Sequence, residues 1–167
     1  VAAGGTGGNR VRRPQRAATH FQIRQHRAAG LEVPAPAECP VRQSMEERKK
    51  WFEKHREGNR PAWVIELKGN YAGWMSVSNF YGRPAYSATV ELSLYIEQAF
   101  QGKGLGKTAI AYALEKAPGL GINTILAYVF GHNTPSLRLF KKLGFQQWAH
   151  LPGVAVMDGQ RRDLIIL

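Results

Sequence analysis

A short glycine-rich stretch, residues 101–107 (QGKGLGK), carries the residue types best suited to bind a ligand. Its three glycines at alternate positions leave main-chain N–H groups uncovered, and they permit the positive φ angles that turn several N–H groups toward one point. A helix that begins at about Leu105 adds further unpaired N–H groups and the positive end of its dipole. Lys103 and Lys107 add positive charge. We therefore predict a site for a phosphate-type anion at this corner.

The loop is expected to join a strand to a helix. Apolar and polar residues alternate strictly over residues 88–97, which predicts a half-buried strand. Apolar residues recur at helical spacing over residues 105–116, and Pro118 with two nearby glycines ends the predicted helix. A second helix follows a turn at Asn133 and ends at Gly144. Further strands are expected over residues 62–67, 71–79, 124–130 and 163–167.

These elements predict an α/β (or α+β) fold with one mixed sheet. Residues 62–67 and 71–79 are joined by a short Gly-Asn connection that is typical of a β-hairpin, so one side of the sheet is expected to be antiparallel. The two strands that flank the loop helix are expected to pair in parallel.

Three phosphate-binding loops share parts of the glycine pattern. A Walker A loop requires a glycine at the position of Gln101, so this loop cannot make that motif's first turn. The Rossmann pattern is matched by Gly104, Gly106 and Ala109, but the next strand ends without the acidic residue that binds the ribose. The third pattern, Gln-x-x-Gly-x-Gly, fits from Gln101 to Gly106. Taken alone, the loop is also compatible with a glycine-rich turn that has no ligand.

The third pattern resembles the pyrophosphate loop of the GCN5-related N-acetyltransferases, the GNAT superfamily, and the order of the flanking elements resembles the core of that superfamily. Within it, the sequence is similar to the phosphinothricin and methionine-sulfoximine acetyltransferase group. The shared motifs, spread over roughly residues 44–167, are residues 90–96, the loop, Asn133-x-Pro-Ser136-Leu-x-Leu-Phe, Leu143-Gly-Phe145 and Asp163. The resemblance implies the GNAT fold and acetyl-coenzyme A (acetyl-CoA) as co-substrate. No metal is expected, because no His/Cys spacing suggests a metal site.

The resemblance also implies how acetyl-CoA is held. The two strands that flank the loop helix splay apart in the superfamily, and the cofactor enters the gap between them. Main-chain groups of three strand residues run beside the pantetheine arm, loop N–H groups bind the pyrophosphate, and Asn133 hydrogen-bonds the arm. The cofactor-binding residues expected are Leu94, Tyr95, Ile96, Gln101, Gly102, Lys103, Gly104, Leu105, Gly106, Lys107, Asn133 and Ser136.

Glu91 is the candidate catalytic base. It lies on the polar face of the strand that enters the loop, and the family carries a Glu at the matching position. A partly desolvated carboxyl has a raised pKa and can accept a proton from an amine, although a solvated strand face would also explain this residue. Phe140 stands where the family often has a His or Tyr, so no general acid is assigned. His132, Tyr95 and Tyr128 remain open for that function.

Residues 80–86 lie where the similar group lines its acceptor pocket. Phe80 and Tyr81 would shape a small pocket beside Glu91, and Arg83 can pair with a carboxylate or phosphinate in a bidentate manner. An ordinary surface turn around Arg83 is equally compatible. The predicted acceptor is a small amino acid or analogue with an anionic group. Two alternatives stay open: acetylation of a protein N-terminus or lysine, and a coenzyme A-binding module with impaired catalysis.

Composition divides the chain into two parts. The net charge is +11, and residues 1–43 hold seven Arg, no Lys and two Glu amid many Ala, Gly and Pro. We expect this part to be a disordered or atypical extension. A nucleic-acid-binding arm is the alternative, but Phe21 is its only aromatic residue. Residues 44–167 are expected to form the acetyltransferase domain, opening with a helix capped by Ser44, although its N-terminal elements match the family incompletely.

Composition also bears on compartment and partners. No apolar run approaches about 18 residues, and the N-terminus lacks the apolar segment of a signal peptide, so neither a membrane span nor export is expected. The single cysteine, Cys39, cannot form an internal disulfide and fits a reducing compartment, which predicts a cytoplasmic protein. The expected partner is a small-molecule amine. The resemblance adds a homodimer as an expectation.

Overall fold

The computed structural model describes residues 21–25, 55 and 58–167. The strands are β1 (Phe21–Gln25), β2 (Ala62–Leu67), β3 (Asn70–Asn79), β4 (Thr89–Ile96), β5 (Thr124–Leu126), β6 (Tyr128–Phe130), β7 (Ala149–Met157) and β8 (Gln160–Ile166). The α-helices with described bounds are α2 (Leu105–Lys116) and α3 (Thr134–Lys142). Short 3-10 turns are η1 (Pro84–Tyr86), η2 (Gln98–Phe100) and η3 (Pro118–Leu120).

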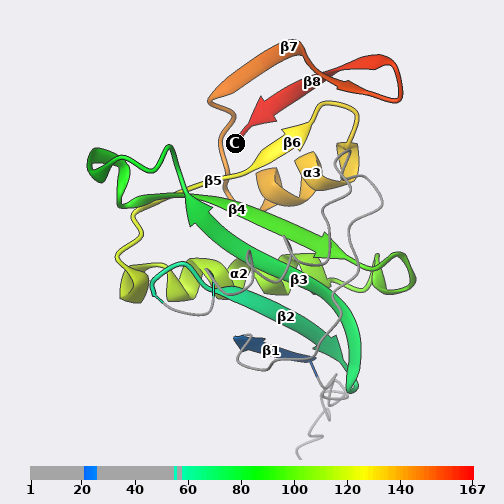
Figure 1. Ribbon diagram of the computed structural model, residues 1–167. Coiled ribbons are helices and arrows are strands. Elements are labelled where there is room, and N and C mark those ends of the chain that lie inside the picture. Colours follow the sequence, from blue (N-terminus) through cyan, green and yellow to red (C-terminus); the bar gives the residue numbers. More distant parts are fainter. Residues whose placement is uncertain (1–20, 26–54, 56–57) are drawn as a thin grey trace, which may run out of the picture.

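The larger sheet has the strand order β1-β2-β3-β4-β5 (Figure 1). β2 and β3 form the predicted hairpin, and β3 pairs antiparallel with β4. β4 and β5, which flank α2, pair in parallel. The mixed sheet expected from the sequence is therefore confirmed.

The smaller sheet has the order β6-β8-β7 and is antiparallel. The sequence predicted one strand over residues 124–130, and this prediction is wrong at Ala127, where the strand divides into β5 and β6. The physical reason is a change of partner. Ala127 exchanges two main-chain hydrogen bonds with Leu167, at 2.9 and 3.0 Å, so the chain leaves β4 and joins β8. Alternation of side chains cannot reveal such a change, because it continues through the break.

β4 and β6 diverge from this point, as Figure 1 shows. The pairing of β4 with β5 covers only residues 89–91 against residues 124–126, whereas β3 pairs with β4 as far as Ile96. The last residues of β4 therefore have a strand partner on one side only. This is the splayed pair of strands that the resemblance implied.

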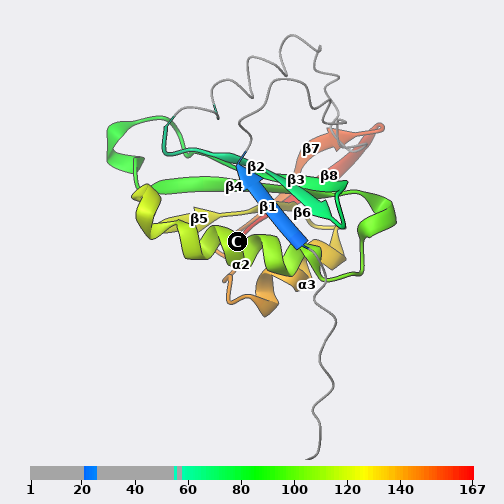
Figure 2. The ribbon, with the colours of Figure 1, turned by 90° about the horizontal axis from the view of Figure 1, so that it is seen from below.

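α2 and α3 lie on the same side of the larger sheet (Figure 2). Val90 and Leu92 of β4 and Ala109 and Ile110 of α2 are almost fully buried in the core beneath the sheet, as their apolar spacing predicts. Burial of this kind is worth roughly 25 cal/mol per Å² of apolar surface. It fixes α2 against β4, and hence fixes the loop between them. α2 spans the predicted residues, and Gly144, with φ 90°, follows the last residues of α3 as predicted.

Two segments differ from the expectations. Within the extension expected to be disordered, β1 pairs antiparallel with β2, and Phe21 and Ile23 pack against the core. The alternation in FQIRQ was the missed signal, hidden among arginines. Near the end of the chain, β8 begins at Gln160, before the predicted Asp163, and β7 was not predicted. The helix expected from Ser44 lies outside the described residues, except His55.

Candidate active site

The loop after β4 presents a row of unpaired main-chain N–H groups. The N–H of Gln101 donates to the carbonyl of Gln98 at 3.2 Å, and the N–H of Thr108 donates to the carbonyl of Gly104 at 3.2 Å. Between them, no N–H from residue 102 to residue 107 has an acceptor within the described part of the chain. Gly102 and Gly104 have φ angles of 72° and 81°, which residues with a Cβ rarely adopt. The N-terminus of the 12-residue helix α2 adds its dipole to this row.

The side chains of the loop are arranged partly as predicted. Gln101 Nε2 donates to the carbonyl of Ile96 at 3.0 Å and so ties the loop to the end of β4. Lys103, expected to add charge to the anion site, instead donates from Nζ to the carbonyl of Ala99 at 2.9 Å. Its Nζ also lies 4.9 Å from the centre of the Phe100 ring, so a carbonyl and an aromatic face hold it against the preceding turn. Lys107 is exposed on the first turn of α2.

Gly106 has a packing function that its spacing alone did not reveal. A Cβ at this position would lie 2.9 Å from Leu139 Cδ2 and 3.6 Å from Leu94 Cδ2. The missing side chain therefore lets α3 and β4 approach the first turn of α2. The glycine pattern thus combines main-chain exposure at Gly102 and Gly104 with close packing at Gly106.

The open edge of β4 offers main-chain groups to a ligand in the gap. The N–H of Phe80 donates to the carbonyl of Thr89, and the N–H of Glu97 donates to the carbonyl of Ala72, with the register unbroken between them. Because main-chain groups alternate in direction along a strand, odd-numbered residues of β4 bond to β3 and even-numbered ones face β5 and the gap. Leu94 and Ile96 therefore face the gap, whereas the main chain of Tyr95 faces β3.

Asn133 occupies the N-cap of α3. Its Oδ1 accepts a hydrogen bond from the N–H of Ser136 at 3.2 Å, which leaves its Nδ2 group without a described acceptor. Phe140 is 5% exposed and packs edge to face against Phe145 with ring centres 5.0 Å apart. Phe140 is thus a core residue, and α3 supplies no proton relay at that position. His132 is exposed and stacks on Phe130 at 5.7 Å.

Glu91 lies half-buried on the face of β4 opposite α2. Burial raises the pKa of its carboxyl above the ordinary value. Ser78 is its cross-strand neighbour on β3, and Ser78 Oγ lies 3.2 Å from Nε2 of the buried His55. Burial also raises the pKa of the Tyr128 phenol, and the negative charges that Glu91 and Tyr81 carry when ionised raise it further. Sequence reasoning named Tyr128 only as an open candidate and did not connect His55 with Glu91.

The predicted acceptor segment forms an aromatic cluster next to this face. The ring of Phe80 lies 5.1 Å from that of Tyr81 and 5.5 Å from that of Tyr86, both nearly edge to face. Tyr81 is 77% exposed and has a φ of 56°, which directs its side chain out of the turn. Arg83 is exposed and directly precedes η1. Tyr128 follows Leu126, the β5 partner of Glu91, by two residues, whereas Arg83 lies exposed before η1.

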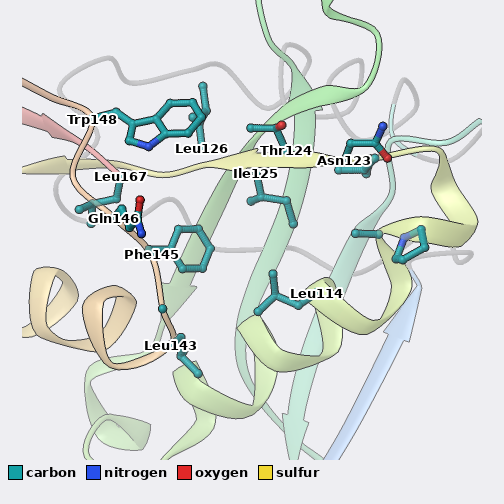
Figure 3. Close-up of a pocket in the computed structure, with 14 residues that line it drawn as sticks. Leu114, Asn123, Thr124, Ile125, Leu126, Leu143, Phe145, Gln146, Trp148 and Leu167 are labelled. Carbon is teal, nitrogen blue, oxygen red and sulfur yellow. The ribbon is translucent and has the colours of Figure 1, made fainter.

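A cavity of about 470 Å³ lies between β5 and α2 (Figure 3), and neither Glu91 nor any of residues 101–107 lines it. Leu114 of α2, residues 122–126, Leu143 and Phe145 line it, and Trp148 covers it from the side of β7. Its wall is largely apolar and contains none of the residues predicted to bind the cofactor or the acceptor. We therefore place the active site at the gap beside β4 and not in this cavity.

Comparison with known proteins agrees with this geometry. The sequence model of the Acetyltransferase (GNAT) family matches residues 26–145. The chain belongs to the GNAT family. The GNAT fold expected from the glycine loop and its flanking elements is thereby confirmed, and the protein is an acyl-CoA-dependent N-acyltransferase. The family match begins within the segment that was expected to be an extension.

Similar GNAT proteins have names that indicate small amino-acid analogues. The chain is 52% identical to the "Putative phosphinothricin acetyltransferase YwnH" of Bacillus subtilis over 123 residues, covering 73% of this chain and 75% of that protein. It is 32% identical to an L-methionine sulfoximine/L-methionine sulfone acetyltransferase of Salmonella typhimurium, covering 70% and 68% of the two chains. The phosphinothricin and methionine-sulfoximine resemblance is thus confirmed.

Solved structures of GNAT proteins also match. A crystal structure described as a putative phosphinothricin N-acetyltransferase has a TM-score of 0.73 at 41% identity, covering 87% of this chain and 95% of that one. A phosphinothricin acetyltransferase from Sinorhizobium meliloti in complex with acetyl-CoA has a TM-score of 0.70 at 26% identity, covering 74% and 68%. Such complexes support acetyl-CoA as the co-substrate of this fold.

Neither a metal site nor a membrane-spanning helix occurs in the part that the structure describes. No group of three His, Cys, Asp or Glu side chains there could hold a metal ion. None of the described helices has both the length and the apolar character needed to cross a bilayer.

Proposed function

We propose that this protein transfers the acetyl group of acetyl-CoA to the amino group of a small amino acid or analogue of the phosphinothricin or methionine-sulfoximine type. The observation that carries the proposal is the row of unpaired N–H groups at residues 102–107, set at the end of β4 where the strands diverge. The names of the similar proteins support the acceptor class.

The residues present fit the cofactor. The N–H row and the dipole of α2 suit a diphosphate, the gap-facing main chain of Leu94 and Ile96 suits the amide groups of a pantetheine arm, and Nδ2 of Asn133 can donate to a carbonyl of that arm. The proposed cofactor site is also bordered by Lys107, Gln101 and Ser136. Gln101 would contribute indirectly, because its hydrogen bond to the carbonyl of Ile96 holds the loop against the end of β4. Acetyl-CoA, when bound, supplies an acetyl group activated as a thioester.

Glu91 serves as the base in this proposal. Its raised pKa suits a carboxyl that must accept a proton from an ammonium group or from a water next to it. Tyr128 stays protonated, because its own pKa is raised, so its phenol can donate a hydrogen bond within the same cluster. Holding the amine near the thioester is expected to give the largest part of the rate enhancement.

The acceptor is proposed to lie between Glu91 and the aromatic cluster of Phe80, Tyr81 and Tyr86. Rings held edge to face present an apolar surface, which suits the side chain of a methionine or glutamate analogue. Arg83 at the rim is proposed to attract an acidic acceptor. A homodimer and a cytoplasmic location remain expectations.

A panel of amines tests this function. Full-length protein is mixed with acetyl-CoA and each amine, and release of the free thiol is followed. We expect turnover with phosphinothricin, methionine sulfoximine or methionine sulfone, and much less with a lysine-containing peptide. Turnover confined to the peptide would favour protein acetylation. Binding of acetyl-CoA without turnover of any amine would favour the coenzyme A-binding module.

A further inference from the structure

Arg162, near the active-site face, has a buried Nε atom that forms no hydrogen bond with any described residue. Arg162 of β8 is half-buried, and its Nε is shielded from solvent yet makes no hydrogen bond. No ion pair or hydrogen bond of this side chain occurs in the part of the chain that the structure describes. A guanidinium stays charged at physiological pH, so withdrawing it from water without an anion is unfavourable.

The register places Arg162 on the same face as Tyr128. Phe130 lies two residues after Tyr128 on β6, and it pairs with Leu164 of β8. Arg162 lies two residues before Leu164, and residues at such spacing share one face of a strand. Leu126, the β5 residue that pairs with Glu91, lies two residues before Tyr128, so alternation places the base, the phenol and the arginine on corresponding faces of the two sheets.

The neighbouring acidic residue cannot neutralise this arginine. Asp163 points to the opposite face, where its Oδ2 lies 2.7 Å from His150 Nε2 and its Oδ1 accepts from the N–H of Gly153 at 2.9 Å. The cross-strand neighbour of Arg162 on β7 is Ala155, whose small side chain leaves room beside the guanidinium. Past the pair of Phe130 and Leu164, the N–H of Gly131 still donates to the carbonyl of Asp163 at 2.8 Å, and no described pairing with β6 reaches Arg162.

We propose that Arg162 binds the anionic group of the amino-acid acceptor. The inference rests on the proposed function, and it names the residue that would make an acidic acceptor preferred over a neutral amine. Tyr128 lies opposite Ile166 of β8, and Arg162 lies four positions before Ile166. At roughly 3.3 Å per residue, Arg162 is therefore about 13 Å along β8 from the level of Tyr128. An extended acceptor whose anion is several bonds from the amine therefore suits the site, and the long arginine side chain spans part of the distance.

The test compares acceptors that differ only in charge. KM and kcat are measured for phosphinothricin, for methionine sulfone and for methionine sulfone α-amide, with wild-type protein and Arg162→Met. Losing a charge-assisted pair should raise KM about 10- to 100-fold for an acceptor whose anion binds Arg162. The α-amide should keep its KM, and kcat should change little. A rise for phosphinothricin alone assigns the side-chain phosphinate, as the spacing favours. A rise for methionine sulfone as well would place the α-carboxylate, which shares its carbon with the amine, at Arg162, and would contradict the extended arrangement.

Control variants separate this effect from misfolding and from other cations. Arg161→Met removes an exposed arginine at the next position, on the face that carries Asp163, and should leave KM unchanged. Arg162→Lys keeps the positive charge but lacks the planar guanidinium, so it should give a KM between those of wild type and Arg162→Met. If Arg162→Met does not fold, a KM above the wild-type value in Arg162→Lys still tests the inference. Affinity for acetyl-CoA should stay at the wild-type value in each folded variant.

Three results would overturn the inference. If each acceptor has the same KM with Arg162→Met as with wild type, Arg162 does not bind the anion. If the KM of the α-amide rises as much as the KM of the charged acceptors, the effect of the substitution is structural only. A selective rise in Arg83→Met but not in Arg162→Met would assign the anion to the turn at η1. These failures differ from failure of the proposed function, in which the wild-type protein acetylates no amine at all.

Discussion

At the scale of a single residue, Glu91 is the proposed general base. It is half-buried, its cross-strand neighbour is Ser78, and burial raises the pKa of its carboxyl. Among the residues that the sequence left open as proton carriers, His132 is exposed and stacks on Phe130, whereas Tyr128 follows the β5 partner of Glu91 by two residues. We therefore propose that the Glu91 carboxyl alone removes the amine proton.

Glu91→Gln should lower kcat by about 100-fold or more, in the usual range for loss of a general base. Affinity for acetyl-CoA, measured by calorimetry, should not change, because the loop and the gap-facing main chain are untouched. Glu115→Gln, on the exposed face of α2, is the matched control and should keep full activity. Full turnover of Glu91→Gln would remove this residue from the mechanism.

The same substitution should affect stability in the opposite direction. A carboxyl whose pKa is higher in the folded than in the unfolded state binds more protons when folded, so its contribution to stability falls as pH rises through the interval between the two pKa values. The neutral Gln side chain removes that cost. Thermal melts should therefore give Glu91→Gln an equal or higher Tm than wild type at pH 7, with the difference vanishing at a pH below the unfolded pKa. A lower Tm at pH 7 and an unchanged difference in acid would contradict the assigned cause.

At the scale of elements, we propose that the strand–loop–helix unit of β4, residues 97–104 and α2 binds the phosphate groups of the cofactor. Gly104 is the N-cap of α2 in the left-handed conformation, with no described atom near the position of an added Cβ. Any residue with a Cβ at position 104 would be strained, because the backbone φ there is 81°. Its Cβ would also lie among the unpaired N–H groups of the loop. The loop therefore needs glycine for its conformation at this position, whereas Gly106 is needed for packing.

Gly104→Ala should weaken binding of acetyl-CoA by about tenfold and lower stability by about 1–2 kcal/mol, the cost of a left-handed residue with a Cβ. Gly119→Ala is the control, since Gly119 has no positive φ and open space around it. Calorimetry with acetyl-CoA and denaturant unfolding measure the two effects. Equal affinities in the two variants would indicate that the loop does not contact the cofactor.

The sequence predicted the elements around the loop better than the elements at the ends of the chain. Strict alternation in β4 and helical spacing in α2 are local signals, so their bounds were predicted closely. The division at Ala127 depends on bonds to Leu167, forty residues later, and local patterns carry no trace of it. Likewise, Arg162 joins the face of Tyr128 only through the pairing of β6 with β8.

At the scale of the whole molecule, the larger and the smaller sheet diverge at Ala127, between β5 and β6. The gap that they leave lies between β4 and β6. In the proposed site, the larger sheet would contribute Glu91 and the open edge of β4, and the smaller sheet would contribute Tyr128 and Arg162. β1 completes the larger sheet at its far edge, through Phe21 and Ile23. The apolar cavity under β5 has no part in this arrangement (Figure 3).

Amide NMR on ¹⁵N-labelled protein tests most directly whether residues 102–107 hold the pyrophosphate. Coenzyme A should shift the amide signals of these residues downfield, because each N–H gains a charged acceptor, whereas pantetheine, which lacks the phosphates, should leave them nearly unchanged. Residues 114–126 around the cavity should respond to neither ligand. Saturable binding of coenzyme A with no change at residues 102–107, or with changes confined to the cavity, would contradict the account.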